Sequence, residues 1–234
     1  YVILTVLGFK KAGKTIPQLT VPMVQKKKIP VPPMPVQQQI IEECAKIDKE
    51  YSAARQSAET CRQAIEDLFA ALDAAGPRRR LSLADTEKFR ISIGKRVLNT
   101  DLVPEGSIPV YSANVMEPFG NIDKLLLSDF SAPSVLWGID GDWMTRCLPA
   151  QTAFYPTDHC GVLRCATSEV NPRYLAHLLE IEGRKAGFSR SYRASIDRVQ
   201  GIVISVPDIQ LQNETAEKVF ALEEQISAAE KLLE

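Results

Sequence analysis

Long hydrophobic runs are missing from this 234-residue chain. The apolar stretch at its start, Val2–Leu7, is far shorter than the ~20 residues that a membrane helix needs. No signal-peptide pattern is present, and Tyr1 rather than Met opens the sequence, so we do not expect residue 1 to be the natural start. The five cysteines form no C-x-x-C pair, which favours reduced thiols in the cytoplasm over a disulfide frame.

Signatures of catalysis are also missing. The sequence has no G-x-S-x-G, H-E-x-x-H or G-x-G-x-x-G motif, and no Asn-Pro-Pro-Tyr-like tetrapeptide of the kind that amino-methyltransferases use. His159-Cys160 and Cys165 do not fit the standard zinc spacings. Asp140-Gly141-Asp142 lacks the further acids of a calcium loop and is expected to be a turn, and His177 stands alone. We therefore predict a chain without catalytic or metal-binding residues.

One motif opposes this reading. Residues 8–15 match G-x-x-x-x-G-K-[ST], the phosphate-binding P-loop, and follow an apolar run. That chemistry needs a helix that starts at Lys14-Thr15, but Pro17 and Pro22 follow at once. A basic loop is the preferred interpretation, and a P-loop nucleotide-binding protein remains an alternative.

The residues that are present suit a globular protein with segregated charge. The chain is 45% hydrophobic and 24% charged, which excludes collagen-like and disordered classes. Its net charge of −1 divides into +6 for residues 1–35, −4 for 36–77, +2 for 78–207 and −5 for 208–234. Basic and acidic segments therefore alternate, a pattern that matters for nucleic-acid binding.

An internal repeat organises the sequence. At an offset of 175 positions, residues 8–58 align without gaps with residues 183–233. Ile29-Pro30-Val31-Pro32 aligns with Ile204-Ser205-Val206-Pro207, and Ser52-Ala53-Ala54 aligns with Ser227-Ala228-Ala229. The alignment indicates two copies of one structural unit.

Both copies end in a predicted long helix. From Ile40 to Leu72, apolar residues alternate spacings of four and three, and the same spacing runs from Thr215 to Leu233. A period of 3.5 residues predicts a coiled-coil seam. A helix over 36–76 would be about 60 Å long and needs a partner helix, so we expect the two helices to pair in antiparallel fashion. An ordinary core helix is the alternative.

The insert between the copies has the length of a domain. Strand-like runs occupy 108–111, 134–137, 161–164 and 201–206, and one helix is predicted over 172–183. We predict a mixed α/β (α+β) domain with many loops, flanked by the long helices.

Basic residues in this domain point to nucleic acid. Arg78-Arg79-Arg80 stands at its start, Lys95-Arg96 follows, and residues 183–200 hold five basic residues against Asp197 alone, interleaved with Ser189, Ser191, Tyr192 and Ser195. Lys and Arg neutralise phosphates, and Arg reads guanine edges. A solvated surface loop has a similar composition, and Lys26–Lys28 is a weaker signal of the same kind.

The whole arrangement resembles the specificity subunits of type I restriction-modification systems. Three parts of the sequence carry the resemblance. Residues 15–19 and 29–40 look like the family's central conserved region, and residues 90–96 and 108–120 look like the opening of its target recognition domain. Residues 171–175, leading to 204–207, look like the end of that domain. The resemblance implies four parts. They are the tail of a preceding recognition domain and a Pro-rich linker (1–35), a coiled-coil helix (36–77), the recognition domain (78–207) and a C-terminal helix (208–234).

The resemblance also implies partners. The recognition domain would bind one half of a split double-stranded DNA site, and the helices would set the spacing and dock adenine-methyltransferase subunits. Those partners would use S-adenosylmethionine, and a translocase-nuclease subunit would use ATP, so this chain itself would hold no cofactor. Because the sequence holds one complete recognition domain, three interpretations stay open. Upstream residues of a full subunit are missing, or the chain is a half-subunit that dimerises through its long helices, or it is the C-terminal part of a fused restriction enzyme-methyltransferase. A DNA nuclease and a coiled-coil scaffold also stay open.

The candidate DNA contacts are chosen by residue type and loop position, because the family's contacts do not transfer by motif. For the DNA backbone we expect Arg79, Arg80, Arg96, Lys124, Arg190 and Arg193. For the bases we expect Tyr111, Asn114, Arg146 and Tyr192.

Overall fold

The structure, a computed structural model, describes residues 21–25, 31–74 and 78–233. It divides into two units, Tyr1–Ala54 and Arg55–Glu234. The P-loop-like residues 8–15, the lysines at 26–28 and the predicted helix end at 76–77 lie outside the described residues.

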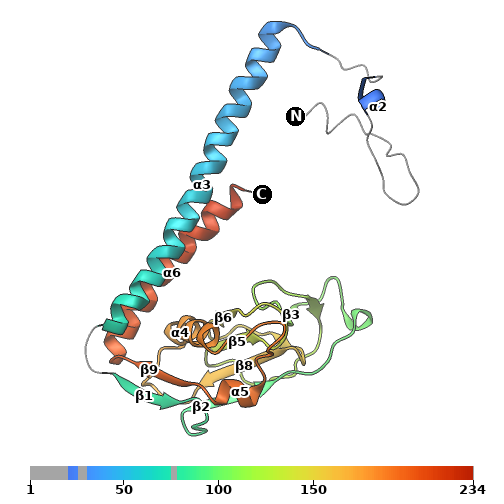
Figure 1. Cartoon of the computed structure of the whole chain (residues 1–234). Helices are drawn as coiled ribbons and strands as arrows, with labels where there is room; N and C mark the ends of the chain where they lie inside the picture. Colours follow the sequence, from blue (N-terminus) through green and yellow to red (C-terminus); the bar gives the residue numbers. More distant parts are fainter. Residues whose placement is uncertain (1–20, 26–30, 75–77, 234) are drawn as a thin grey trace. The chain divides into compact units, whose positions relative to one another are not determined.

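The long helix that the apolar spacing predicts is present. Helix α3 runs from Met34 to Ala74 and continues from the first unit into the second (Figure 1). Pro33 stands directly before it, and the main-chain amides of Val36 and Gln37 donate to the carbonyl of Pro33 in its first turn. Proline fits a helix start because its missing N–H is not needed there.

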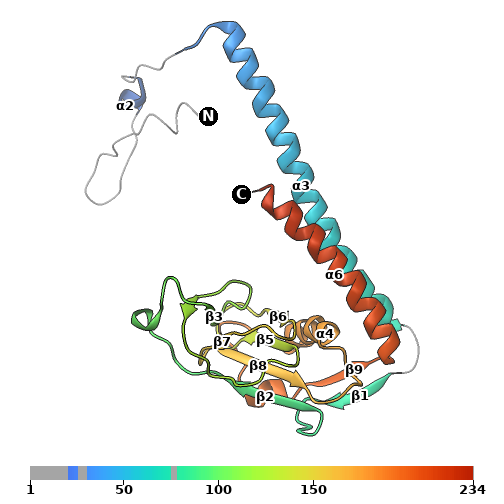
Figure 2. The same ribbon diagram turned by 180° about the vertical axis from the view of Figure 1, so that it is seen from behind.

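Within the second unit, helix α6 (Ile209–Lys231) lies beside the C-terminal part of α3 (Figures 1 and 2). Arg62 forms an ion pair with Glu230, and the Cys61 thiol lies 3.6 Å from Oε1 of Gln225. A groove lined by Ala64 and Ala71 of α3 and by Lys218 and Gln225 of α6 continues the contact toward the start of α6. Later residues of α3 therefore contact earlier residues of α6, so the two helical segments run antiparallel.

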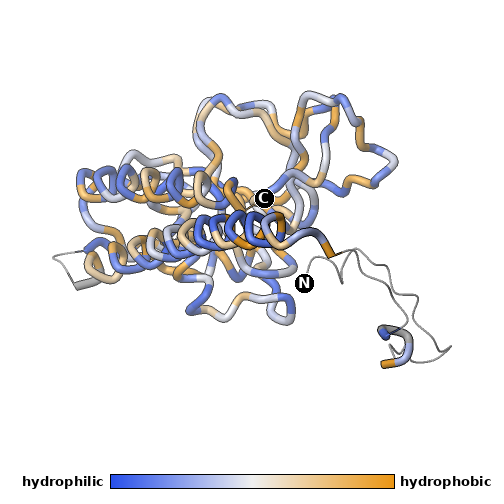
Figure 3. Tube along the Cα trace, turned by 90° about the horizontal axis from the view of Figure 1, so that it is seen from above, coloured by the Kyte–Doolittle hydropathy of each residue, from blue (hydrophilic) through white to orange (hydrophobic). Residues whose placement is uncertain are grey.

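The predicted seam is buried where these helices meet. Ala58, Cys61 and Leu72 of α3 are buried, as are Val219 and Ala229 of α6. Hydrophilic and hydrophobic residues alternate along both helices, as the tube in Figure 3 shows. Burying a side chain of the size of Leu72 or Val219 contributes about 1.5–3 kcal/mol, whereas each buried alanine methyl contributes only about 0.8 kcal/mol.

Helix boundaries support the repeat. Helix α2 (Val21–Gln25) and helix α5 (Ile196–Gln200) are separated by the offset of 175 at both ends, and the starts of α3 and α6 are separated by the same offset. Because sequence alignment and secondary structure agree, we treat the two copies as equivalent elements.

The domain between the long helices is built on an antiparallel sheet. Its strands lie in the order β2 (Phe89–Ile93), β8 (Cys160–Cys165), β5 (Ser134–Gly138) and β6 (Thr145–Leu148). Helix α4 (Pro172–Lys185) contacts β5 and β6 and closes the main hydrophobic core with Tyr174, Leu175 and Leu179 (Figure 2). Asn171 caps its first turn by accepting from the amides of Arg173 and Tyr174.

Smaller sheets flank this centre. Strands β4 (Gly120–Ile122), β3 (Ile108–Tyr111) and β7 (Tyr155–Pro156) form one sheet, in which β3 and β7 are parallel. Strand β1 (Arg79–Ser82) pairs with β9 (Val203–Val206), and a 3-10 helix, η1, spans Asn99–Asp101. The predicted strands and helix therefore exist, and the mixed fold class is confirmed. The domain division at 78 and 207 stays a prediction, since residues 55–234 form one unit.

Two tryptophan rings pack inside the domain, and each occupies the space beside a glycine. Trp137 is fully buried, donates from Nε1 to the carbonyl of Ala194, and leaves no room for a Cβ at Gly161. Trp143 donates to the carbonyl of Glu180 and occupies the space beside Gly183. Larger residues at either glycine would displace an indole ring.

Three cysteines of the domain are largely shielded from solvent. Burial raises the pKa of Cys147 to about 11 and the pKa values of Cys160 and Cys165 to about 12, so these thiols stay protonated at neutral pH. In the described ranges, no helix combines the length and the apolar character that a membrane crossing requires.

Candidate nucleic-acid interface

A polar cavity of about 430 Å³ opens on the domain between the long helices. Three segments form it: the residues after β2, the loop after β3, and the turn that precedes β8. Arg96 lies exposed beside Asn99 and Thr100, and Phe119 is 45% exposed. The cavity therefore combines a cation, an accessible ring and several hydrogen-bonding groups, which is the composition expected of a surface that contacts nucleic acid.

A charged cluster lies behind this cavity. His159 contributes to the cavity wall, and its Nδ1 pairs with Oδ2 of Asp140. The other oxygen of Asp140 pairs with Nε of Arg193. Asp140 therefore ties the loop that carries Arg193 to the cavity. The ion pair with Asp140 therefore neutralises part of the positive charge of Arg193.

One predicted base reader, Asn114, lies on the loop after β3, and another, Arg146 of β6, contacts that loop. Oδ1 of Asn114 accepts from the amides of Met116 and Glu117, so that amide group shapes the loop. Arg146 donates to the carbonyl of Met116 and lies with its guanidinium 5.6 Å from the centre of the Tyr111 ring. Tyr111 is only 5% exposed and packs against Phe154 in the core. Hydrophobic packing therefore holds the Tyr111 ring in the core, and its role as a base reader stays a prediction.

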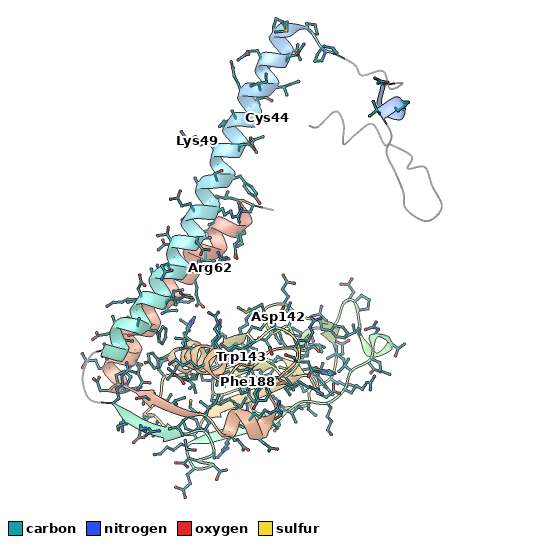
Figure 4. All side chains as sticks on the ribbon, viewed as in Figure 1. Cys44, Lys49, Arg62, Asp142, Trp143 and Phe188 are labelled. Atoms are coloured by element: carbon teal, nitrogen blue, oxygen red, sulfur yellow. The ribbon has the colours of Figure 1, made fainter. Side chains whose placement is uncertain are left out.

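Tyr192 belongs to a stack of side chains. Its ring lies 5.9 Å from Phe188, which in turn lies 5.0 Å from Trp143, and Arg198 covers Tyr192 at 4.0 Å. Figure 4 shows Trp143 and Phe188 next to each other. Arg198 also donates to the carbonyl of Arg193 and so holds the loop. Phe188 and Arg198 therefore hold the ring of Tyr192 in place, while the residue stays 44% exposed.

The remaining predicted cations differ in how much of their charge is available. Arg190 and Arg80 are exposed, and the described part of the chain gives neither an ion pair. Lys124 is exposed and lies 5.8 Å from the ring of Tyr155. Arg79 pairs with Glu169, whose pKa is lowered mainly by a hydrogen bond from Lys88 and by the charges of Lys88 and Arg79. Arg79 therefore supports the β1–β9 end of the domain and does not offer a free charge.

Sequence reasoning missed an arginine pair. Arg90 on β2 and Arg164 on β8 are direct cross-strand partners, although like charges opposite each other destabilise a sheet. Asp129 lies nearby with a lowered pKa, caused first by hydrogen bonds from Ser131 and then by the charges of Arg164 and Arg90. Burial lowers the pKa of Arg164 itself. The strand register that places the two together could not be read from the sequence.

The predicted contacts thus fall into separate places. The cavity and its supporting cluster bring together Arg96 and Arg193. The loop after β3 adds Asn114, and Arg146 of β6 contacts that loop. Arg79 and Arg80 lie on β1, while Arg190 and Tyr192 lie on the loop that carries the aromatic stack. Within the described ranges, no three His, Cys, Asp or Glu side chains converge on a common metal position. Which residues touch DNA stays a prediction.

Comparison with known proteins gives a consistent picture. No family model matches the chain. The type I restriction enzyme MpnII specificity subunit of Mycoplasma pneumoniae is 26% identical over 120 residues, which is 50% of this chain and 36% of that relative. S.MpnORF615P of the same organism, whose name assigns it to type I specificity subunits, has the same identity over the same number of residues, 47% of its length. The match therefore spans less than half of each relative.

Solved structures extend the likeness to the fold. The S subunit of a type I restriction-modification system from M. genitalium matches 95% of this chain and 63% of its own, with a TM-score of 0.67 at 16% identity. The HsdS subunit from Thermoanaerobacter tengcongensis matches 98% of this chain and 61% of its own, with a TM-score of 0.50 at 17% identity. In sequence over half of its length and in fold over nearly all of it, this chain resembles the specificity subunits of type I restriction-modification systems.

Proposed function

We propose that this chain is a sequence-specific DNA-recognition component of a type I restriction-modification system. One observation carries the proposal: the segments that the repeat identifies begin their helices in register, flank a mixed domain, and have the fold of known specificity subunits. A helix pair of this kind holds a recognition domain at a fixed place, and exposed cations such as Arg96 and Arg190 supply the phosphate contacts.

The finer assignments belong to the same proposal. The recognition domain binds one half of a bipartite double-stranded site, and the long helices dock adenine-methyltransferase subunits. The open groove between α3 and α6, lined by Ala64, Leu68, Ala71 and Leu222, supports such docking. The chain acts without catalysis or a cofactor of its own in the cytoplasm, while the methyltransferase uses S-adenosylmethionine and a translocase-nuclease uses ATP. A second copy joining through the long helices would supply the other half-site.

Selection from a random duplex pool tests the proposal. The chain, together with an adenine methyltransferase of the same type I system, is used to enrich DNA at two salt concentrations, and retention of the methyltransferase is read in the same experiment. We expect one short motif to be enriched, or a spaced palindrome if two copies act together. Binding that shows no motif and weakens steeply with salt would contradict the proposal, since it would reveal only a basic surface.

A further inference from the structure

A second cavity of the domain, of about 380 Å³, lies beside the exposed ring of Tyr192. The end of α4, the loop that follows it, helix α5 and the start of β9 line this cavity. Its two cations are Lys185 and Arg198, and both residues are exposed. Lys185 pairs with Glu182 at 2.7 Å, whereas the described part of the chain gives Arg198 no ion pair. Arg198 therefore supplies the uncompensated positive charge of the cavity.

The loop that joins α4 to α5 is held at both ends. Ser189 and Tyr192 exchange two main-chain hydrogen bonds of 3.0 and 3.1 Å, so the tip between them is a tight two-residue turn. Ala194 is buried, and its carbonyl accepts from the indole of Trp137. The amide of Ala194 donates to the carbonyl of Ile139, directly after β5. The loop therefore has little freedom to move relative to the central sheet.

Two contacts orient the guanidinium of Arg198. It lies 4.0 Å from the centre of the Tyr192 ring, and one of its amino groups donates to the carbonyl of Arg193 at 2.7 Å. The Tyr192 ring is itself stacked on buried Phe188, with 5.9 Å between the ring centres. A guanidinium carries five N–H donors, so further donors remain after the contact with Arg193. They belong to an exposed side chain whose plane is fixed by the protein.

We propose that Arg198 reads a guanine in the major groove, and that Tyr192 is a positioning residue that holds its guanidinium. Guanine presents two acceptors there, N7 and O6, whereas adenine presents an amino group that a guanidinium cannot accept from. A phosphate contact depends mainly on charge, but base readout needs a side chain held in a fixed geometry. The two contacts that orient Arg198 therefore favour a base as its ligand. The inference rests on the proposed DNA-recognition function and names one base-reading residue within it.

The test compares two arginines that each cover an exposed aromatic ring. Arg198→Ala removes the proposed reader, and Arg173→Ala removes the same charge and the same kind of contact, since Arg173 lies 4.2 Å from the ring of Phe220. Arg173 belongs to the first turn of α4, and we assign it no DNA contact. Each variant of the full chain is taken through duplex selection with the methyltransferase, beside the unaltered chain. Thermal unfolding midpoints within a few degrees of the unaltered chain show that both variants are folded.

We expect one position of the motif to show a strong preference for guanine in the unaltered chain. Arg198→Ala should reduce that preference by about 5- to 150-fold, because a good bidentate base contact discriminates by about that factor. Arg173→Ala should leave every position of the motif unchanged. Because both variants lose one positive charge, this difference separates base reading from a general effect of charge.

Two further comparisons test the contact and the positioning. Replacing that guanine by 7-deazaguanine removes the N7 acceptor, so it should weaken binding by the unaltered chain and have little effect on Arg198→Ala. Tyr192→Ala should lower the guanine preference by about 2- to 5-fold, the range of an exposed cation–π contact, while the other motif positions keep their preferences. Tyr192→Phe keeps the ring and should retain the full preference.

Four results would overturn the inference. A motif that Arg198→Ala leaves unchanged, or one that holds no guanine, would remove Arg198 from base reading while the proposed function stands. Uniform weakening by Arg198→Ala on every sequence would assign Arg198 to a phosphate. An equal effect of 7-deazaguanine on Arg198→Ala and on the unaltered chain would show that another residue contacts N7. If the unaltered chain enriches no motif, the proposed function fails and this inference fails with it.

Discussion

The starts of α3 and α6 are equivalent positions of the repeat, yet their surroundings differ. In both, a glutamine in the first turn donates to a proline carbonyl five residues earlier: Gln37 to Pro32 at 2.7 Å and Gln212 to Pro207 at 2.9 Å. Gln212 is fully buried, also donates to the carbonyl of Glu169, and accepts from the amide of Asn171. Gln37 is half-buried, and Pro32 is the partner that the described residues give it.

The contrast continues along the helices. Ile40 and Cys44 of α3 are exposed, whereas the equivalent Thr215 and Val219 of α6 are 4% and 1% exposed. Ile47 is 62% exposed, whereas its equivalent Leu222 is half-buried. The spacing of apolar residues therefore specifies which face of a helix can be buried. Whether that face is buried depends on which elements of the fold lie against it.

The largest expected effect comes from charging equivalent seam positions. Val219→Asp places a carboxylate in a dry contact and should lower the free energy of unfolding by at least about 3 kcal/mol. Cys44→Asp makes the same change at the equivalent exposed position and should stay within about 0.5 kcal/mol. Urea denaturation of both variants measures the difference. Equal losses would show that residue 44 is buried in solution and that the two copies have similar surroundings.

The glutamines give the next prediction. Gln212→Ala removes three hydrogen bonds, of which the one to the carbonyl of Pro207 is buried and the other two are part-buried, so we expect a loss of about 2–3 kcal/mol. Gln37→Ala removes one half-buried hydrogen bond and should cost about 0.5–1.5 kcal/mol. Hydrogen exchange at the amide of Asn171 reads the local effect, and faster exchange is expected in the Gln212 variant alone. Unchanged exchange there would contradict the assigned hydrogen bond.

Local patterns predicted the fold well, for reasons that these copies illustrate. The 3.5-residue period, the prolines before each helix and the short β-rich runs each depend on neighbouring residues, so a sequence displays them directly. The helix over 36–76 is observed at 34–74, and the strand at 108–111 has the predicted bounds. The antiparallel pairing of α6 with residues after Arg55 also follows from the shared seam. The exposure of Ile47 could not be predicted, because it depends on what the helix meets.

The candidate site was much harder to predict. Residue type suggested Tyr111 and Tyr192 as base readers, but it did not show that Tyr111 is 5% exposed in the core, whereas Tyr192 is 44% exposed beside Phe188 and Arg198. The contact of His159 with Asp140, which supports one wall of the cavity, joins residues 19 positions apart. Sites made by tertiary contacts have no local pattern to read.

The smallest expected effect concerns the ion pair that joins the two long helices. Arg62 and Glu230 are 48% and 51% exposed at their side chains, so solvent screens their attraction. A double-mutant cycle of Arg62→Ala and Glu230→Ala should give a coupling of about 0.2–1 kcal/mol, reduced at high salt. The matched cycle for Lys46 and Glu50, an exposed i,i+4 pair within α3, should give about 0.3–0.5 kcal/mol. Because Arg62 and Glu230 belong to different helices, only their coupling should vanish when Val219→Asp separates α6 from α3. A coupling that persists in that background would mean that the pairing of the helices does not depend on the buried seam.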